Sequence, residues 1–112
     1  MKLERHSANG IEVITLTGSL DAAAAPEARK EIKQIIGEGK NKLVFDLSHL
    51  TFLDSSGLSV FVSALKAARA DGGDVVLLNL TPNIRALIEL MRLHYVFDIF
   101  DDEGAAVAKL RG

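Results

Sequence analysis

The sequence has no cysteine, no strong excess of charge of either sign and no long apolar run. Without cysteine, thiol catalysis, disulfide scaffolds and cysteine-based zinc sites are excluded. Thirteen basic and fifteen acidic residues give a formal charge of −2, so no basic field attracts nucleic acid. No uncharged apolar run reaches the roughly 18 residues of a membrane-spanning helix, and residues 1–6 lack the apolar segment of a signal peptide. We therefore expect a cytoplasmic protein without a membrane span.

What is present is typical of a globular domain. Hydrophobic residues make up 48% of the 112 residues and charged residues make up 25%. A chain of this length buries enough surface for a core without a disulfide or metal. We therefore expect one domain over residues 1–112.

Strand-like and helix-like segments alternate along the chain. Asn9-Gly10 is a strong signal for a hairpin turn. The predicted strands are Leu3–Ser7, Ile11–Thr17, Leu43–Leu47, Val75–Leu78 and Val96–Phe100. The predicted helices are Pro26–Ile36, Ser56–Ala70, one starting at Thr81-Pro82 with Ile84, Leu87, Ile88 and Met91 on its buried face, and Glu103–Leu110. This order predicts an α/β fold: a small, mixed, mostly parallel sheet of four to five strands flanked by about four helices.

Local patterns for enzymatic or metal chemistry are weak. The three histidines, His6, His49 and His94, have no helical spacing that would support a metal site. Ser55, His49 and an aspartate could compose a triad, but the G-x-S-x-G elbow is absent. The acidic cluster of Asp98, Asp101, Asp102 and Glu103 fits a loop that leads into a helix N-terminus. The segment Gly37–Lys40 follows a helix, which is the reverse of the order that a phosphate loop requires.

The segment Asp54-Ser55-Ser56-Gly57-Leu58 lies between the predicted polar connection 48–56 and a helix. It supplies three potential capping side chains where one is enough. Two adjacent hydroxyls also lie where α/β sheets commonly display functional residues. A phosphate on a serine there would be compatible with the free N–H groups of the helix N-terminus. The residues by themselves leave both simple capping and a functional role open.

This segment, together with Leu16–Asp21, Leu43–Asp54 and Gly72–Leu78, carries a family resemblance. On these residues the chain resembles STAS-domain proteins of the anti-sigma factor antagonist (anti-anti-sigma factor) family. The resemblance covers nearly the whole chain. Its most specific parts are D-S-S-G-L and, after the second predicted strand, L-x-G-x-L-D.

The resemblance implies a phosphorylation-switched binding protein that is not an enzyme and uses no cofactor or metal. The unphosphorylated family member sequesters an anti-sigma factor, which is also a serine kinase of the histidine-kinase-like ATPase fold. A sigma factor is thereby freed for transcription. The kinase phosphorylates the first serine after the aspartate, here Ser55, and a serine phosphatase reverses the reaction.

The resemblance also implies a partner-binding set: Asp21, Asp54, Ser55, Ser56, Gly57 and Leu58. In the family, the aspartate that Asp21 matches lies close to the phosphorylation site, and we expect Ser56 to help to cap the helix. An exposed apolar patch near Leu20 and Leu58 would support a protein partner. The family usually has more polar or bulky residues where this chain has Ala22–Ala25. Which side chains of this stretch contact a partner therefore stays open.

Two other functional classes stay open on the sequence alone. The chain could be a STAS interaction subunit of another assembly, such as a lipid-transport complex or a signalling scaffold, without a phosphoserine switch. It could also be a small enzyme or nucleotide-binding protein. Phosphorylation by a cognate kinase would distinguish an anti-sigma factor antagonist from a STAS subunit of another assembly. Nucleotide turnover by the purified chain would favour the enzyme or nucleotide-binding protein.

Overall fold

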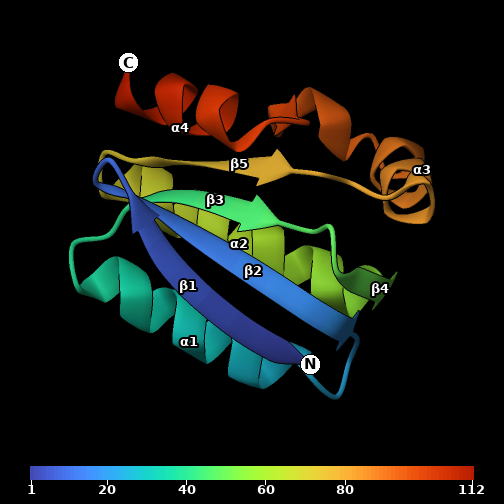
Figure 1. Cartoon of the computed structure of the whole chain (residues 1–112). Coiled ribbons are helices and arrows are strands. Elements are labelled where there is room, and N and C mark those ends of the chain that lie inside the picture. The colour runs from blue at the N-terminus through green and yellow to red at the C-terminus, as the bar shows by residue number, and fades with distance from the viewer.

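The computed structural model describes all residues from 1 to 112, and a twisted six-stranded sheet forms its centre (Figure 1). The strands are β1 (Lys2–Ala8), β2 (Ile11–Leu20), β3 (Lys42–Asp46), β4 (Leu50–Leu53), β5 (Asp74–Leu78) and β6 (Ile99–Phe100). The main path runs β1-β2-β3-β5-β6, and β4 pairs with β2 alone. Only the β1–β2 pair is antiparallel. The predicted mixed, mostly parallel sheet is confirmed.

The hairpin between β1 and β2 follows from its two turn residues. Asn9 has φ 52° and Gly10 has φ 81°. A two-residue turn with positive φ at both positions matches the right-handed twist of the strands it joins. The Asn9-Gly10 prediction is therefore confirmed, and it fixes the register that sets Lys2 opposite Thr17.

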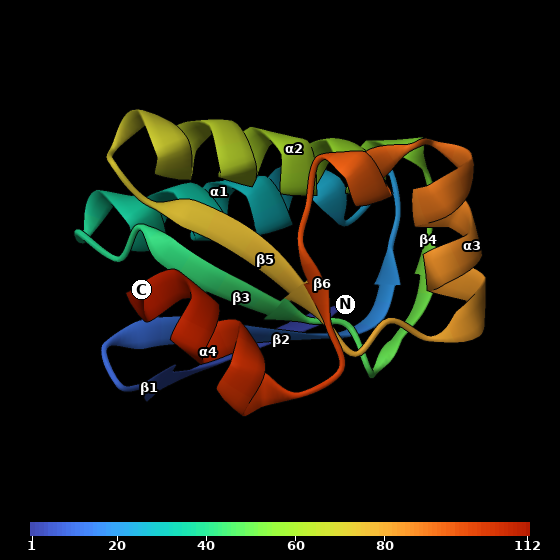
Figure 2. The same ribbon diagram turned by 90° about the horizontal axis from the view of Figure 1, so that it is seen from above.

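The helices lie on both faces and at one end of the sheet. They are α1 (Ala25–Gly37), α2 (Ser55–Ala70), α3 (Pro82–Leu90), the 3-10 helix η1 (Leu93–Tyr95) and α4 (Glu103–Arg111). Figure 1 shows α1 and α2 on one face and α4 on the other. Figure 2 shows α3 beside β4 at the end of the sheet. None of these helices combines the length and the apolar composition needed to cross a bilayer.

Alternating side chains of the central strands fill two separate cores. On the α1–α2 face, the ring of Phe45 packs on that of Phe61 with the centroids 5.2 Å apart. On the other face, Val44 and Val76 pack with Val107 of α4. Strands covered on both faces read as continuous apolar runs, which is why β3 and β5 were visible in the sequence.

Glu12 is the one polar or charged residue that the fold buries, with 5% of its surface exposed. Arg5 on β1 donates from Nε to Glu12 Oε2 and from Nη2 to Glu38 Oε1. The hydrogen bond to Glu12 is the main cause that raises the pKa of the Arg5 guanidinium above its ordinary value. Because a buried carboxylate needs a partner, Arg5 ties the edge strand to β2 and to the end of α1.

The predicted polar connection 48–56 contains a strand, β4, that the sequence analysis did not foresee. Its four residues do not alternate between buried and exposed, since Leu50 and Leu53 are buried and the two residues between them are both exposed. Its hydrogen-bond partners come from the last residues of β2, beyond the part that pairs with β3. Pairing to such an extension is a tertiary feature that local periodicity does not encode.

Thr81 and Pro82 are the N-cap and the first residue of α3, as predicted, although the Thr81 side chain makes no capping hydrogen bond. Two other predictions after β5 are corrected. Met91 lies outside α3 and is 51% exposed, instead of packing in the core. The predicted strand 96–100 is reduced to β6, because residues 93–95 form η1 and Val96 is exposed.

Candidate functional site

The D-S-S-G-L segment connects β4 to α2 at the carboxyl end of the parallel strands. β4 pairs with the end of β2 so that Leu53 lies opposite Leu20. Asp54 and Asp21 are the next residues after these two. The parallel pairing therefore brings together the start of α2 and the loop between β2 and α1, which are distant in the sequence.

Asp54 holds these two segments in place. Its Oδ1 accepts from the backbone N–H of Gly57 at 3.0 Å, which caps α2. Its Oδ2 accepts from the N–H of Ala22 at 3.2 Å, in the neighbouring loop. Asp21 folds that loop by accepting from the N–H of Ala24 at 3.0 Å. Of the three potential caps in the sequence, Asp54 is the one that the structure uses.

Ser55 is the first residue of α2, and its side chain is exposed. Its hydroxyl makes no hydrogen bond to the rest of the chain. Ser56 is half-buried, and the capping expected of it is supplied by Asp54 because the N-cap position lies two residues earlier. The Ser55 hydroxyl therefore stabilises no part of the fold by hydrogen bonding, and it is exposed to solvent.

Gly57 and Leu58 form the buried base under Ser55. A Cβ on Gly57 would lie 2.2 Å from the carbonyl oxygen of Leu20 and 2.5 Å from a methyl carbon of Leu53. Leu58 is 4% exposed and Leu20 is fully buried. Leu20 and Leu58 themselves form no exposed apolar patch, because these side chains pack the start of α2 onto β2.

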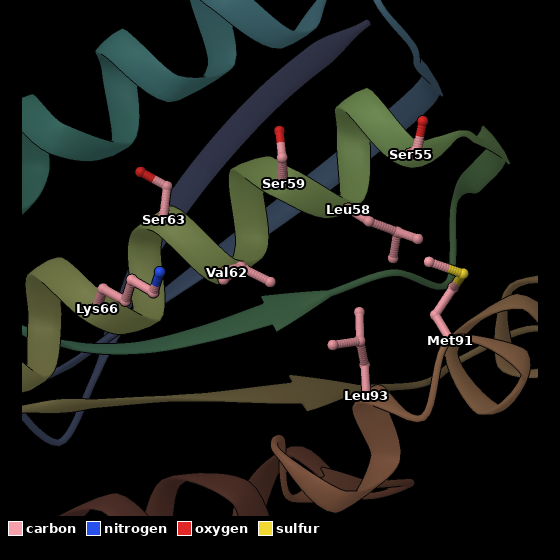
Figure 3. Close-up of a pocket in the computed structure, with 8 residues that line it drawn as sticks. All are labelled: Ser55, Leu58, Ser59, Val62, Ser63, Lys66, Met91 and Leu93. Carbon is pink, nitrogen blue, oxygen red and sulfur yellow. The ribbon is translucent and has the colours of Figure 1, made fainter.

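Exposed apolar side chains gather next to Leu58, on the α3–η1 side of α2. A groove of about 390 Å³ runs between α2 and residues 91–93 (Figure 3). Its lining consists of Ser55, Leu58, Ser59, Val62, Ser63, Lys66, Met91 and Leu93. Leu90 and Tyr95, each 77% exposed, lie in the same stretch of chain as Met91. The sequence analysis missed this surface, because Met91 fits a helical apolar face equally well.

The alternative chemical sites gain no support. Ser55 and His49 share no hydrogen bond, and His49 is an exposed residue of the turn before β4. Asp102 accepts from the N–H of Ala105 at 2.9 Å and caps α4, as the acidic cluster predicted. Residues 37–40 end α1 and lead into β3, as predicted for a plain loop. No three His, Asp or Glu side chains lie close enough together to hold a metal ion.

The model of the STAS domain family matches residues 2–106. The chain belongs to the STAS domain family. The family predicted from the D-S-S-G-L and L-x-G-x-L-D motifs is therefore confirmed. The match takes in the whole of the site, from the Asp21 loop to η1.

Named relatives of this STAS domain are anti-sigma factor antagonists. The anti-sigma-B factor antagonist of Bacillus subtilis is 30% identical over 95 residues, which cover 85% of each chain. The anti-sigma F factor antagonist of Paenibacillus polymyxa is 26% identical over 111 residues, 98% of this chain and 95% of the relative. The solved structure of the anti-sigma factor antagonist SpoIIAA in its unphosphorylated form is 25% identical, with a TM-score of 0.77 over 99% of both chains. SpoIIAA, a Bacillus cell fate determinant, is also solved in a phosphorylated form, and that structure has a TM-score of 0.75 over 98% of this chain and 100% of SpoIIAA.

Proposed function

We propose that this STAS domain is an anti-sigma factor antagonist switched by phosphorylation of Ser55. The unphosphorylated form binds an anti-sigma factor that is a serine kinase of the histidine-kinase-like ATPase fold. Binding sequesters the kinase and frees a sigma factor for transcription in the cytoplasm. The observation that carries the proposal is the exposed, unbonded Ser55 hydroxyl at the start of α2, in a chain whose named relatives are such antagonists.

The proposed modification needs a serine that a kinase can reach. The Ser55 oxygen attacks the γ-phosphorus of ATP, the new O–P bond forms, and the bond to the β-phosphate oxygen breaks. ADP leaves, and the hydroxyl proton passes to a base or to water in the kinase site. A serine phosphatase returns Ser55 by hydrolysis. The product phosphate lies at the N-terminus of α2, where the helix dipole favours negative charge, so the fold tolerates it.

The groove beside Ser55 extends the proposed docking surface. Ser55 forms one end of its lining, and Met91 and Leu93 form the wall opposite α2 (Figure 3). Met91 is half exposed, and the exposed Leu90 precedes it. A few side chains that fill well-packed pockets near the centre of an interface supply most of its binding energy. We therefore infer that an apolar side chain of the anti-sigma factor fills the groove next to Ser55.

Ser55→Ala is expected to abolish phosphorylation and to preserve binding. The purified chain is incubated with ATP and each anti-sigma factor kinase encoded in its source genome, and the phosphate incorporated is measured by mass spectrometry. The wild type takes up one phosphate and the variant takes up none, while its Kd changes by less than about threefold because one small hydroxyl is lost. Ser59→Ala, one turn along α2, is the control and keeps its phosphorylation. A phosphate on the Ser55→Ala variant would refute Ser55 as the acceptor.

Met91→Asp is expected to weaken binding to the same kinase by about 30-fold, because a carboxylate in the groove loses its water without gaining a partner. The side chain is 51% exposed in the free chain, so the melting temperature should stay the same. Leu90→Asp is the matched control, since Leu90 is 77% exposed and does not line the groove. If both variants bound like the wild type, the partner would not enter the groove.

A further inference from the structure

Arg29 on α1 is a cation without an acidic partner, and it lies against the helix that carries Ser55. Its Nη2 donates to Ser59 Oγ at 2.7 Å. No carboxylate lies within ion-pair distance of Arg29, whereas Arg5, Arg69 and Arg85 each have at least one such partner. A guanidinium held by one neutral hydroxyl keeps most of its donors free for an anion.

Arg29 has no acidic neighbour at helical spacing on α1 and none on α2. On α1, the positions three and four residues before and after it hold Pro26, Ala25, Ile32 and Lys33. On the other side, α2 has no acidic residue along its whole length. The seam between the two helices therefore has a positive charge and a row of hydroxyls, but no anion.

The row of hydroxyls leads from Arg29 to Ser55. Ser55, Ser59 and Ser63 follow each other at four-residue spacing, and Figure 3 shows their hydroxyls on the same side of α2, away from Met91. Side chains at this spacing have Cβ atoms about 5–6 Å apart. A phosphate extends the Ser55 side chain by a further two bonds. Arg29, which contacts Ser59, therefore lies one helical turn along α2 from the position of that phosphate.

We propose that Arg29 is the phosphate-binding residue of the phosphorylated protein. It leaves Ser59 Oγ and donates through its guanidinium to the phosphate oxygens on Ser55. The inference rests on the proposed function only for the kinase that installs the phosphate; the pairing itself is a property of this chain.

This pairing changes what a partner meets at the docking surface. A phosphate carries a charge of about −1.5 to −2 at pH 7, so one guanidinium leaves a net negative charge and a much larger group at position 55. Arg29 is at the same time withdrawn from Ser59 and held against α2. Phosphorylation therefore fixes two side chains at the rim of the groove, in addition to adding charge.

The test uses the full chain with phosphoserine incorporated at position 55 during translation, so that no kinase is needed. The second pKa of the phosphate is measured by 31P NMR titration. The carboxylates of Asp21 and Asp54 raise this pKa, and the N-terminus of α2 and Arg29 lower it. Arg29→Gln leaves the other groups in place, and it should raise the phosphate pKa by about 0.5 unit, the size expected for a partly exposed ion pair.

Two variants make the result specific. Lys33→Gln removes the same charge from α1 one turn further from Ser55, and it should shift the phosphate pKa by much less. Ser59→Ala frees Arg29 from its present partner, and it should leave the pKa unchanged or lower it. Equal shifts for Arg29→Gln and Lys33→Gln would overturn the proposal in favour of unspecific charge. If the kinase fails to phosphorylate the wild type while the titration succeeds, the proposed function fails and this inference stands.

Discussion

Ser55→Asp is expected to weaken binding to the anti-sigma factor by about 100-fold while the melting temperature stays the same or rises slightly. Ser55 is exposed and makes no side-chain bond within the chain, so a carboxylate displaces nothing. It is also the first residue of α2, where an acidic side chain contributes about 0.3–1 kcal/mol through the helix dipole. Folding and binding should therefore respond in opposite directions.

The loss of binding follows from the new charge that the partner meets at position 55. A partner carboxylate about 5 Å from that charge is repelled by roughly 3 kcal/mol at an effective dielectric constant of 20, and a 100-fold loss of affinity needs only about 2.8 kcal/mol. The aspartate side chain must also lose water when the partner docks, which adds to the cost.

Ser55→Asn separates charge from size, because its side chain has nearly the shape of aspartate. Binding is measured by calorimetry, and melting by circular dichroism, for the wild type and both variants. Asparagine should retain most of the affinity that aspartate loses, and the difference should shrink at high salt because exposed charges are screened. Equal binding by the aspartate variant and the wild type would contradict an electrostatic switch at Ser55.

Much of the fold could be predicted because local chemistry determines it. Asn9-Gly10 allows the positive φ values of a tight hairpin, and Pro26 suits the first turn of α1. The apolar runs of β3 and β5 report burial on both faces. In each case the signal lies within the few residues that form the element.

Only part of the site could be predicted, because the rest depends on contacts between residues that are distant in the sequence. The D-S-S-G-L motif makes Ser55 a candidate for phosphorylation, and the structure places this serine at the surface as expected. The groove depends on Met91 leaving the helical face that its spacing suggests, and the contact of Arg29 with Ser59 joins residues 30 positions apart. Such contacts arise from the packing of α1, α2 and η1, which no local pattern specifies.

Gly57→Ala is expected to destabilise the domain by about 2 kcal/mol, because overpacking costs about 1–3 kcal/mol and outweighs the better helix propensity of alanine. The added carbon would lie 2.2 Å from the carbonyl oxygen of Leu20. That oxygen belongs to a paired strand, so α2 must move instead. The movement strains the Asp54 cap, whose Oδ1 accepts from the Gly57 N–H, and it displaces Ser55. Stability and affinity for the anti-sigma factor should therefore fall together.

Gly37→Ala provides the matched control. Gly37 ends α1 without a positive φ, and an added Cβ there meets no atom within 4 Å. The same substitution should stabilise the chain by about 0.5 kcal/mol through the unfolded state. Urea unfolding of the two variants should give shifts of opposite sign. If Gly57→Ala unfolded at the wild-type urea concentration, α2 would not depend on its close contact with β2, and the position of Ser55 would need another explanation.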